Sequence, residues 1–158
     1  MLGLRLLRST FVGSRAIRVE LRHTVFVETL IEASVAAGSK DDGLTMAQEL
    51  LDEALLNDGR CCVPEMLRLR GELALYRGVP APADLAAEKD FAEALDIAGR
   101  QGAHMWRLRA ATSLARLLQR RGERSEARNL LLPIHERFTE GFATADLRAA
   151  RALINHLQ

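Results

Sequence analysis

The sequence has almost no excess of charge of one sign and very little cysteine. Its 158 residues contain 22 Lys and Arg against 21 Asp and Glu, so the formal net charge is only +1. That balance excludes a bulk electrostatic attraction to nucleic acid or to an anionic membrane. The two cysteines, Cys61 and Cys62, are adjacent, which matches neither a disulfide framework nor a CxxC metal or redox motif. We expect both to be reduced thiols.

Aromatic residues are also scarce, at 4% of the chain, and only four prolines interrupt it. The β-branched residues never form the alternating runs that strands need, so the composition favours an all-helical fold. Hydrophobic residues at 48% and charged residues at 27% are typical of a globular domain and exclude a disordered chain. A chain of this length buries about 68–70% of its unfolded surface, so the core needs no disulfide or metal.

A helical pattern recurs every 40 residues. In each copy an alanine is followed four positions later by a large apolar residue. These pairs are Ala47/Leu51, Ala87/Phe91 and Ala127/Leu131. Bulky residues that suit the start of the preceding helix recur with the same spacing, and these are Phe26, Met66 and Trp106. A period of this length built from helix pairs is typical of an α-solenoid, in which each pair buries its apolar face against its neighbours.

The pattern predicts three helix pairs and a C-terminal capping helix. The expected ranges are 24–37 with 42–56, 64–77 with 84–100, 103–121 with 123–138, and a last helix from about 144 to the end. Asp84 is expected to cap its helix, and Gly102 and Gly122 to end theirs. Pro133 should bend or shorten the helix that contains it, because it removes a backbone hydrogen bond.

The same pattern assigns inward and outward faces. Phe91 and Trp106 are predicted to be packing residues, and Tyr76 is placed on the apolar face of its helix. The capping helix should bury an apolar stripe and expose a polar side, as the outermost helix of a solenoid does. The apolar stripe is Leu147, Ala150, Leu153, Ile154 and Leu157, and the polar side is Arg148, Arg151 and Asn155.

The N-terminal segment 1–21 differs from the repeat domain 22–158. It contains four arginines and no acidic residue before Glu20. We interpret it as a remnant helix of an earlier repeat or a disordered start. The alternative is an organelle-targeting peptide in residues 1–20, since transit peptides are rich in arginine and poor in acids. Arginines interrupt its apolar stretch too often for a membrane span.

Several segments resemble tetratricopeptide repeats, in which small residues let paired helices approach closely. These segments include Gly71-Glu72-Leu73 and Gly122-x4-Ala127-x3-Leu131. A more specific likeness spans about residues 24–157 and rests on Leu67–Leu73, Phe91–Ala98, Leu108–Leu117 and Phe138–Leu147, above all on Phe138-Thr139-Glu140-Gly141-Phe142. These are similar to the C-terminal repeat region of bacterial adenylate/guanylate cyclase or winged-helix regulators with a STAND-type ATPase domain.

The resemblance implies a right-handed α-α superhelix that serves as the regulatory part of a signalling or transcription-regulatory protein in the bacterial cytoplasm. It carries over no catalytic residue, because the chain has no cyclase core and no Gly-x4-Gly-Lys-[Ser/Thr] phosphate loop. The expected partner is a protein, a peptide or another domain of a larger parent chain. A homodimer formed through an open apolar edge of the first helix pair is the alternative.

The sequence contains no convincing set of catalytic or metal-binding residues, so we predict that the protein is not an enzyme and binds no cofactor. The four histidines are too far apart for a local metal-ligand pair. Glu28 and Glu32 are one helical turn apart, but acid–base catalysis also needs a pocket, and a solvated face is the simpler interpretation. Cys61 lies just before a predicted helix start at Pro64, yet no adjacent histidine would activate its thiol.

The most distinctive surface feature is a set of arginines in the third repeat. Arg109, Arg116 and Arg120 share one helical face, because they are seven and eleven positions apart. If that face lines a groove, the three guanidinium groups are candidates to bind the carboxylates of an acidic peptide. The alternative is an ordinary solvated face. Direct nucleic-acid binding is disfavoured, since no aromatic residues interleave with the arginines.

Overall fold

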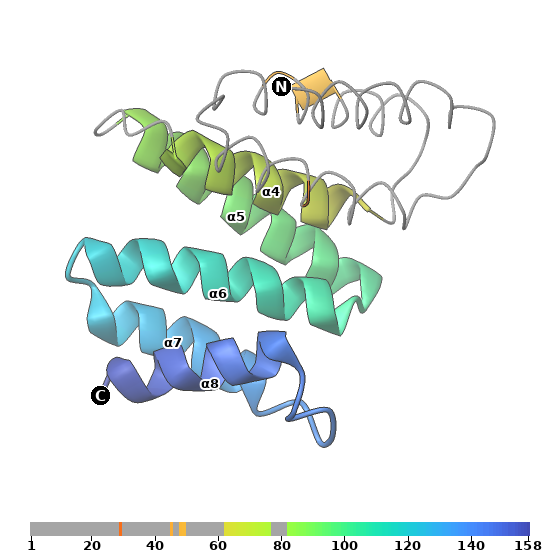
Figure 1. Cartoon of the computed structure of the whole chain (residues 1–158), viewed down its shortest axis with the longest axis vertical. Coiled ribbons are helices and arrows are strands. Elements are labelled where there is room, and N and C mark those ends of the chain that lie inside the picture. The colour runs from red at the N-terminus through yellow and green to blue at the C-terminus, as the bar shows by residue number, and fades with distance from the viewer. Residues whose placement is uncertain (1–28, 30–44, 46–47, 50–61, 77–81) are drawn as a thin grey trace.

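The computed structural model describes residues 62–76 and 82–158, with the isolated positions 29, 45, 48 and 49 (Figure 1). Its main elements are α4 (Val63–Tyr76), α5 (Pro82–Gln101), α6 (His104–Arg120), α7 (Arg124–His135) and α8 (Ala145–His156). The described ranges contain helices and no strand, which confirms the all-α prediction. The predicted first helix pair, the segment 1–21 and the residues Phe26, Glu28, Glu32 and Cys61 lie outside them, apart from those isolated positions.

Two glycines end their helices as predicted. Gly102 and Gly122 adopt φ angles of 67° and 85°, in the left-handed region that glycine enters without a Cβ penalty. After α6, the amide of Gly122 donates to the carbonyl of Gln119 and the amide of Glu123 to that of Leu118, both at 3.0 Å. This pair of bonds is a Schellman motif, which satisfies carbonyls that the helix leaves without a partner.

The prolines set two other boundaries. The helix α5 begins at Pro82, because the fixed φ and missing amide of proline suit a first turn. The prediction that Asp84 caps this helix was therefore wrong, and Asp84 lies in the first turn. Pro133 lies in the last turn of α7, which ends at His135 and not at the predicted residue 138. The expected shortening is confirmed.

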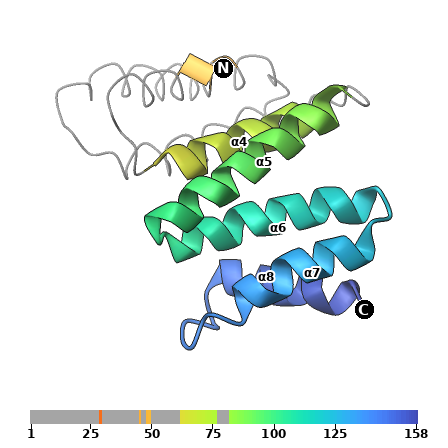
Figure 2. The ribbon, with the colours of Figure 1, turned by 180° about the vertical axis from the view of Figure 1, so that it is seen from behind.

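The five helices are stacked along the long axis of the molecule (Figures 1 and 2). Each helix packs against the next one in the chain, and α4 also contacts α6, which in turn contacts α8. Among these described helices, α5 and α7 do not contact each other. One layer is thus continuous through α4, α6 and α8, and we call its outward surface the α4–α6–α8 face.

The helices α4 and α5 approach each other closely at Gly71. Gly71 on α4 is buried against the ring of Phe91 on α5, and Phe91 has no exposed surface. A Cβ at position 71 would lie 2.6 Å from Cε1 of Phe91, which is well inside van der Waals contact. A bidentate pair between Arg70 and Asp90, with distances of 2.8 and 2.5 Å, joins the same two helices.

Most of the predicted faces are confirmed. The apolar stripe of α8 is buried, and Arg148, Arg151 and Asn155 are exposed. Cys62 is a buried thiol. The placement of Tyr76 on an apolar face was wrong, because its side chain is 49% exposed in the last turn of α4. Trp106 is only half-buried.

None of the helices in the described part of the chain is both long enough and apolar enough to cross a bilayer.

Candidate functional site

The predicted arginines do not all reach the same place. Arg109 and Arg116 line one hollow of about 180 Å³ on the α4–α6–α8 face. Arg120, one turn further along α6, is exposed but does not line it. The hollow is mainly polar, and its full lining is Arg68, Arg109, Thr112, Ser113, Arg116, Asp146 and Ala149.

The local sequence explains why these side chains meet. On α6 the polar positions 109, 112, 113 and 116 follow the three- and four-residue spacing of one helical face. The opposite face of the helix carries the buried Leu108, Ala111, Ala115 and Leu118. The apolar side is therefore drawn into the core. The polar side lies between α4 and α8, where Thr112 and Ser113 are buried and Arg116 is exposed.

The hollow adjoins a buried carboxylate. Glu65, in the first turn of α4, has a side chain that is 1% exposed. Its Oε1 lies 2.7 Å from Nη2 of Arg68 and 2.7 Å from Nη1 of Arg109. Arg109 also reaches α8, with its Nε 3.6 Å from Oδ1 of Asp146. A buried carboxylate without a charged partner is costly. Glu65 therefore keeps Arg109 in place, and this arginine connects α4 with α6 and α8.

A second polar contact extends this arrangement along α4. The hydroxyl of Ser113 donates to Oε1 of Glu72 at 2.5 Å, and Nη1 of Arg68 lies 3.7 Å from the same oxygen. The links from α4 to α6 therefore run from Glu65 to Arg109 and from Glu72 to Ser113, in the same order along both helices. This order means that α4 and α6 are parallel.

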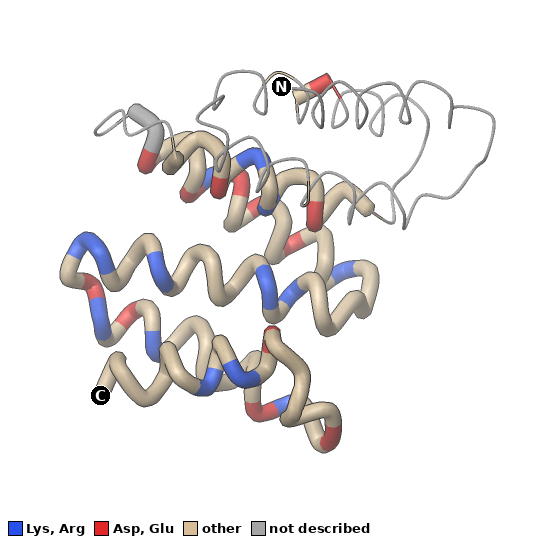
Figure 3. Tube along the Cα trace, viewed as in Figure 1, with Lys and Arg blue, Asp and Glu red and all other residues tan. Residues whose placement is uncertain are grey.

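Arg116 differs from Arg109 in its surroundings. It is exposed, and it makes no hydrogen bond or ion pair in the part of the chain that the structure describes. Figure 3 shows that α6 carries basic charge and no acidic charge along its length. Arg116 thus offers a guanidinium at the mouth of the hollow, whereas Arg109 is held as part of its wall.

Sequence reasoning missed the acidic partners. The spacing of Glu65 and Arg68 on one helix was visible, but the contacts of Arg109 with Glu65 and Asp146 join residues 44 and 37 positions apart. A hollow with three arginines and one carboxylate at its surface is suited to bind an anionic group. Among the described residues, no group of three or more His, Cys, Asp or Glu is placed to hold a metal ion.

No model of a known protein family matches the chain, and no curated protein matches it either.

Proposed function

We propose that the chain is a non-catalytic interaction module, a tetratricopeptide-like solenoid that binds an acidic segment of a partner protein on the α4–α6–α8 face. The observation that carries the proposal is the contrast between its two arginines. Arg109 is fixed by Glu65 and Asp146, and Arg116 is exposed with no partner among the described residues. Because Arg109 is already held in place, only the Arg116 side chain has to be ordered when a carboxylate binds, which lowers the entropy cost of binding.

The arrangement of the helices supports the solenoid part of this proposal. Parallel helices that contact in series, with the intervening helices in a second layer, are expected when helix pairs stack as repeats. The 40-residue period of the sequence and the close approach at Gly71 agree with this architecture. In it, the continuous layer forms the surface on which peptides bind.

Arg120 extends the candidate surface beyond the hollow. It follows Arg116 by one helical turn and is also exposed without a partner among the described residues. A peptide that lies along α6 would bring one carboxylate to each guanidinium. Asp146, which also lines the hollow, would repel a third acidic group, so we expect a short acidic stretch and not a long one.

The test is selection of binders from a random peptide library displayed on phage, with the immobilised protein as bait. We expect a consensus with two acidic residues, whose affinity falls at least about tenfold in the double variant Arg116→Gln/Arg120→Gln. Arg128→Gln, on α7, is the matched control and should bind as the wild type does. A consensus without acids, or equal binding by the double variant, would contradict the proposed surface.

The place of the module in a larger protein rests on the family resemblance. We propose that it is the regulatory C-terminal part of a bacterial signalling ATPase or cyclase. An antibody raised against residues 60–158 tests this in source cells. A native polypeptide several times larger than 17.5 kDa is expected, and a band near 17.5 kDa would contradict it. Light scattering of the purified chain separately tests the homodimer alternative.

A further inference from the structure

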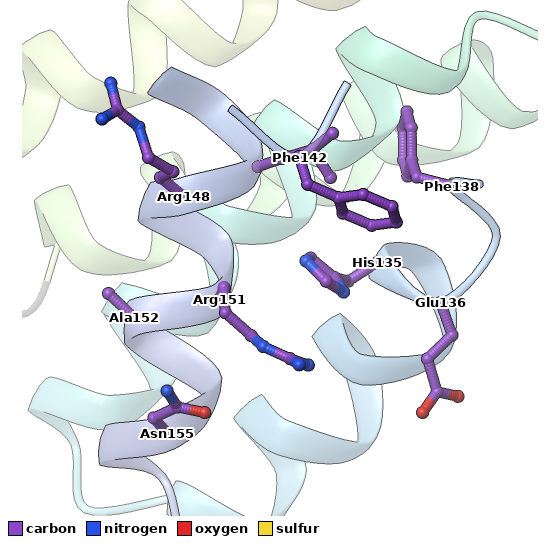
Figure 4. Close-up of a pocket in the computed structure, with 9 residues that line it drawn as sticks. His135, Glu136, Phe138, Phe142, Arg148, Arg151, Ala152 and Asn155 are labelled. Atoms are coloured by element: carbon purple, nitrogen blue, oxygen red, sulfur yellow. The ribbon is translucent and has the colours of Figure 1, made fainter. Parts of the chain in front are cut away.

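A second and larger cavity lies between α7 and α8, at the C-terminal end of the stack. It has a volume of about 550 Å³, which is within the range of small-molecule sites. We call it the α7–α8 slot. Figure 4 shows it between α8 on one side and the end of α7 with the following segment on the other. Its lining is His135, Glu136, Phe138, Phe142, Leu147, Arg148, Arg151, Ala152 and Asn155.

One wall of the slot is cationic. Arg148, Arg151 and Asn155 follow the spacing of a single face of α8, and all three are exposed. Neither arginine makes a hydrogen bond or an ion pair within the described ranges. In Figure 4 the guanidinium of Arg151 extends across the slot toward His135, whereas Arg148 points away from it. Arg151 is therefore the group placed to meet an anion inside the slot.

The other wall is aromatic. Phe142 is 54% exposed, and its ring centroid lies 6.4 Å from that of the buried His135. Phe138 is half-buried on the same side of the slot. Burial and the nearby charge of Arg151 lower the pKa of His135, although Glu136 acts in the opposite direction. The lowered pKa favours the neutral imidazole, whose ring forms part of this aromatic wall.

We infer that the α7–α8 slot binds an aromatic or long aliphatic group that carries a carboxylate. The apolar part covers Phe142 and Phe138, and the carboxylate meets Arg151, with the amide of Asn155 on the same wall. An exposed phenylalanine beside a guanidinium that has no partner among the described residues is complementary to such an amphiphilic anion. Glu136, which also lines the slot, disfavours a second negative charge, so the slot selects a monoanion.

Two kinds of ligand combine an apolar group with a carboxylate in this way: a free small-molecule acid and the C-terminal residue of a peptide. The probes are therefore 3-phenylpropionate and N-acetyl-Gly-Phe, each compared with its uncharged amide. Binding is measured by titration of the ¹⁵N-labelled protein in NMR spectra. We expect both acids to shift amide signals within residues 135–142 and 148–155. The acid that binds more tightly shows which of the two kinds of ligand the slot prefers. Each uncharged amide should bind at least about tenfold more weakly than its acid.

Variants separate this slot from the proposed peptide surface. Arg151→Gln should weaken the acids at least about tenfold and leave the amides unchanged, because only the acids use its charge. Phe142→Ala should weaken acids and amides alike. Arg120→Gln is the matched control, since it alters an exposed arginine of the α4–α6–α8 face and should leave slot binding unchanged.

Three results would overturn the inference. They are no site-specific shift at millimolar acid with the protein folded, equal affinity for acid and amide, or equal acid affinity in Arg151→Gln. Self-association that is lost in Phe142→Ala would instead assign the slot to a second copy of the chain. None of these results depends on the peptide selection, so failure of the slot and failure of the proposed function are distinguishable.

Discussion

Replacement of Gly71 by alanine tests the close contact between α4 and α5. The added Cβ would lie 2.6 Å from Cε1 of Phe91 and 3.0 Å from its Cδ1 and Cζ. Carbon atoms in contact are normally about 3.5–4.0 Å apart, so the ring or the helix must move by roughly 1 Å. Overpacking of this kind costs about 1–3 kcal/mol. The better helix propensity of alanine returns about 0.5–1 kcal/mol.

The expected net effect of Gly71→Ala is a loss of about 1–2 kcal/mol in the free energy of unfolding. For a chain of this size that loss lowers Tm by roughly 2–8 °C. Thermal and urea unfolding, followed by circular dichroism at 222 nm, measures both quantities. The control is Gly99→Ala on α5, where the atom nearest to the new Cβ would be Nε of Arg107, at 3.6 Å. That variant should be unchanged or slightly more stable.

A double-mutant cycle identifies Phe91 as the cause. Phe91 is fully buried, so Phe91→Ala alone should cost about 3–5 kcal/mol. Phe91→Leu should cost less in the Gly71→Ala background than in the wild type, because the smaller side chain relieves the clash. A coupling energy near zero, or a Gly71→Ala variant as stable as Gly99→Ala, would refute the reasoning from close packing.

Two other predictions concern charged and titrating groups. Arg109→Ala should lower the free energy of unfolding by about 1–3 kcal/mol, because buried Glu65 loses a charged partner. Arg116→Ala on the same helix should change it by no more than about 0.5 kcal/mol. Equal urea unfolding midpoints for the two variants would contradict this prediction. The lowered pKa of His135 means that the unfolded chain binds a proton more readily, so stability should fall as the pH drops below about 6.5. His135→Gln should remove part of this loss of stability, whereas His104→Gln, at an exposed position, should leave it unchanged. Unfolding series at pH 7.5 and at pH 5 measure the difference.

The contrast between Arg109 and Arg116 also corrects a test suggested by the sequence. With only the sequence in hand, replacement of Arg109, Arg116 and Arg120 together is expected to weaken binding without unfolding the chain. The structure shows that Arg109 holds a buried carboxylate. The triple variant therefore confounds stability with binding, and the pair Arg116 and Arg120 is the sound choice.

Local chemistry allowed much of the helical structure to be predicted. The ends at Gly102 and Gly122 follow from the backbone freedom of glycine. The buried stripe of α8 follows from apolar residues spaced at the helical period. Such features depend on residues only a few positions apart, so the sequence displays them directly. Tyr76 was misplaced because periodicity assigns a residue to a helical face but does not show how far that face is covered by the rest of the fold.

Only the tertiary structure decided which charged side chains are paired within the fold and which are exposed to a ligand. By sequence, Arg109 and Arg116 are equivalent members of one helical face. Packing brings Glu65 and Asp146 from distant parts of the chain to Arg109 and leaves Arg116 exposed. The α7–α8 slot arises in the same way, because its two walls come from different elements. The strength of a charge contact depends on distance and burial in the folded chain, and sequence separation fixes neither.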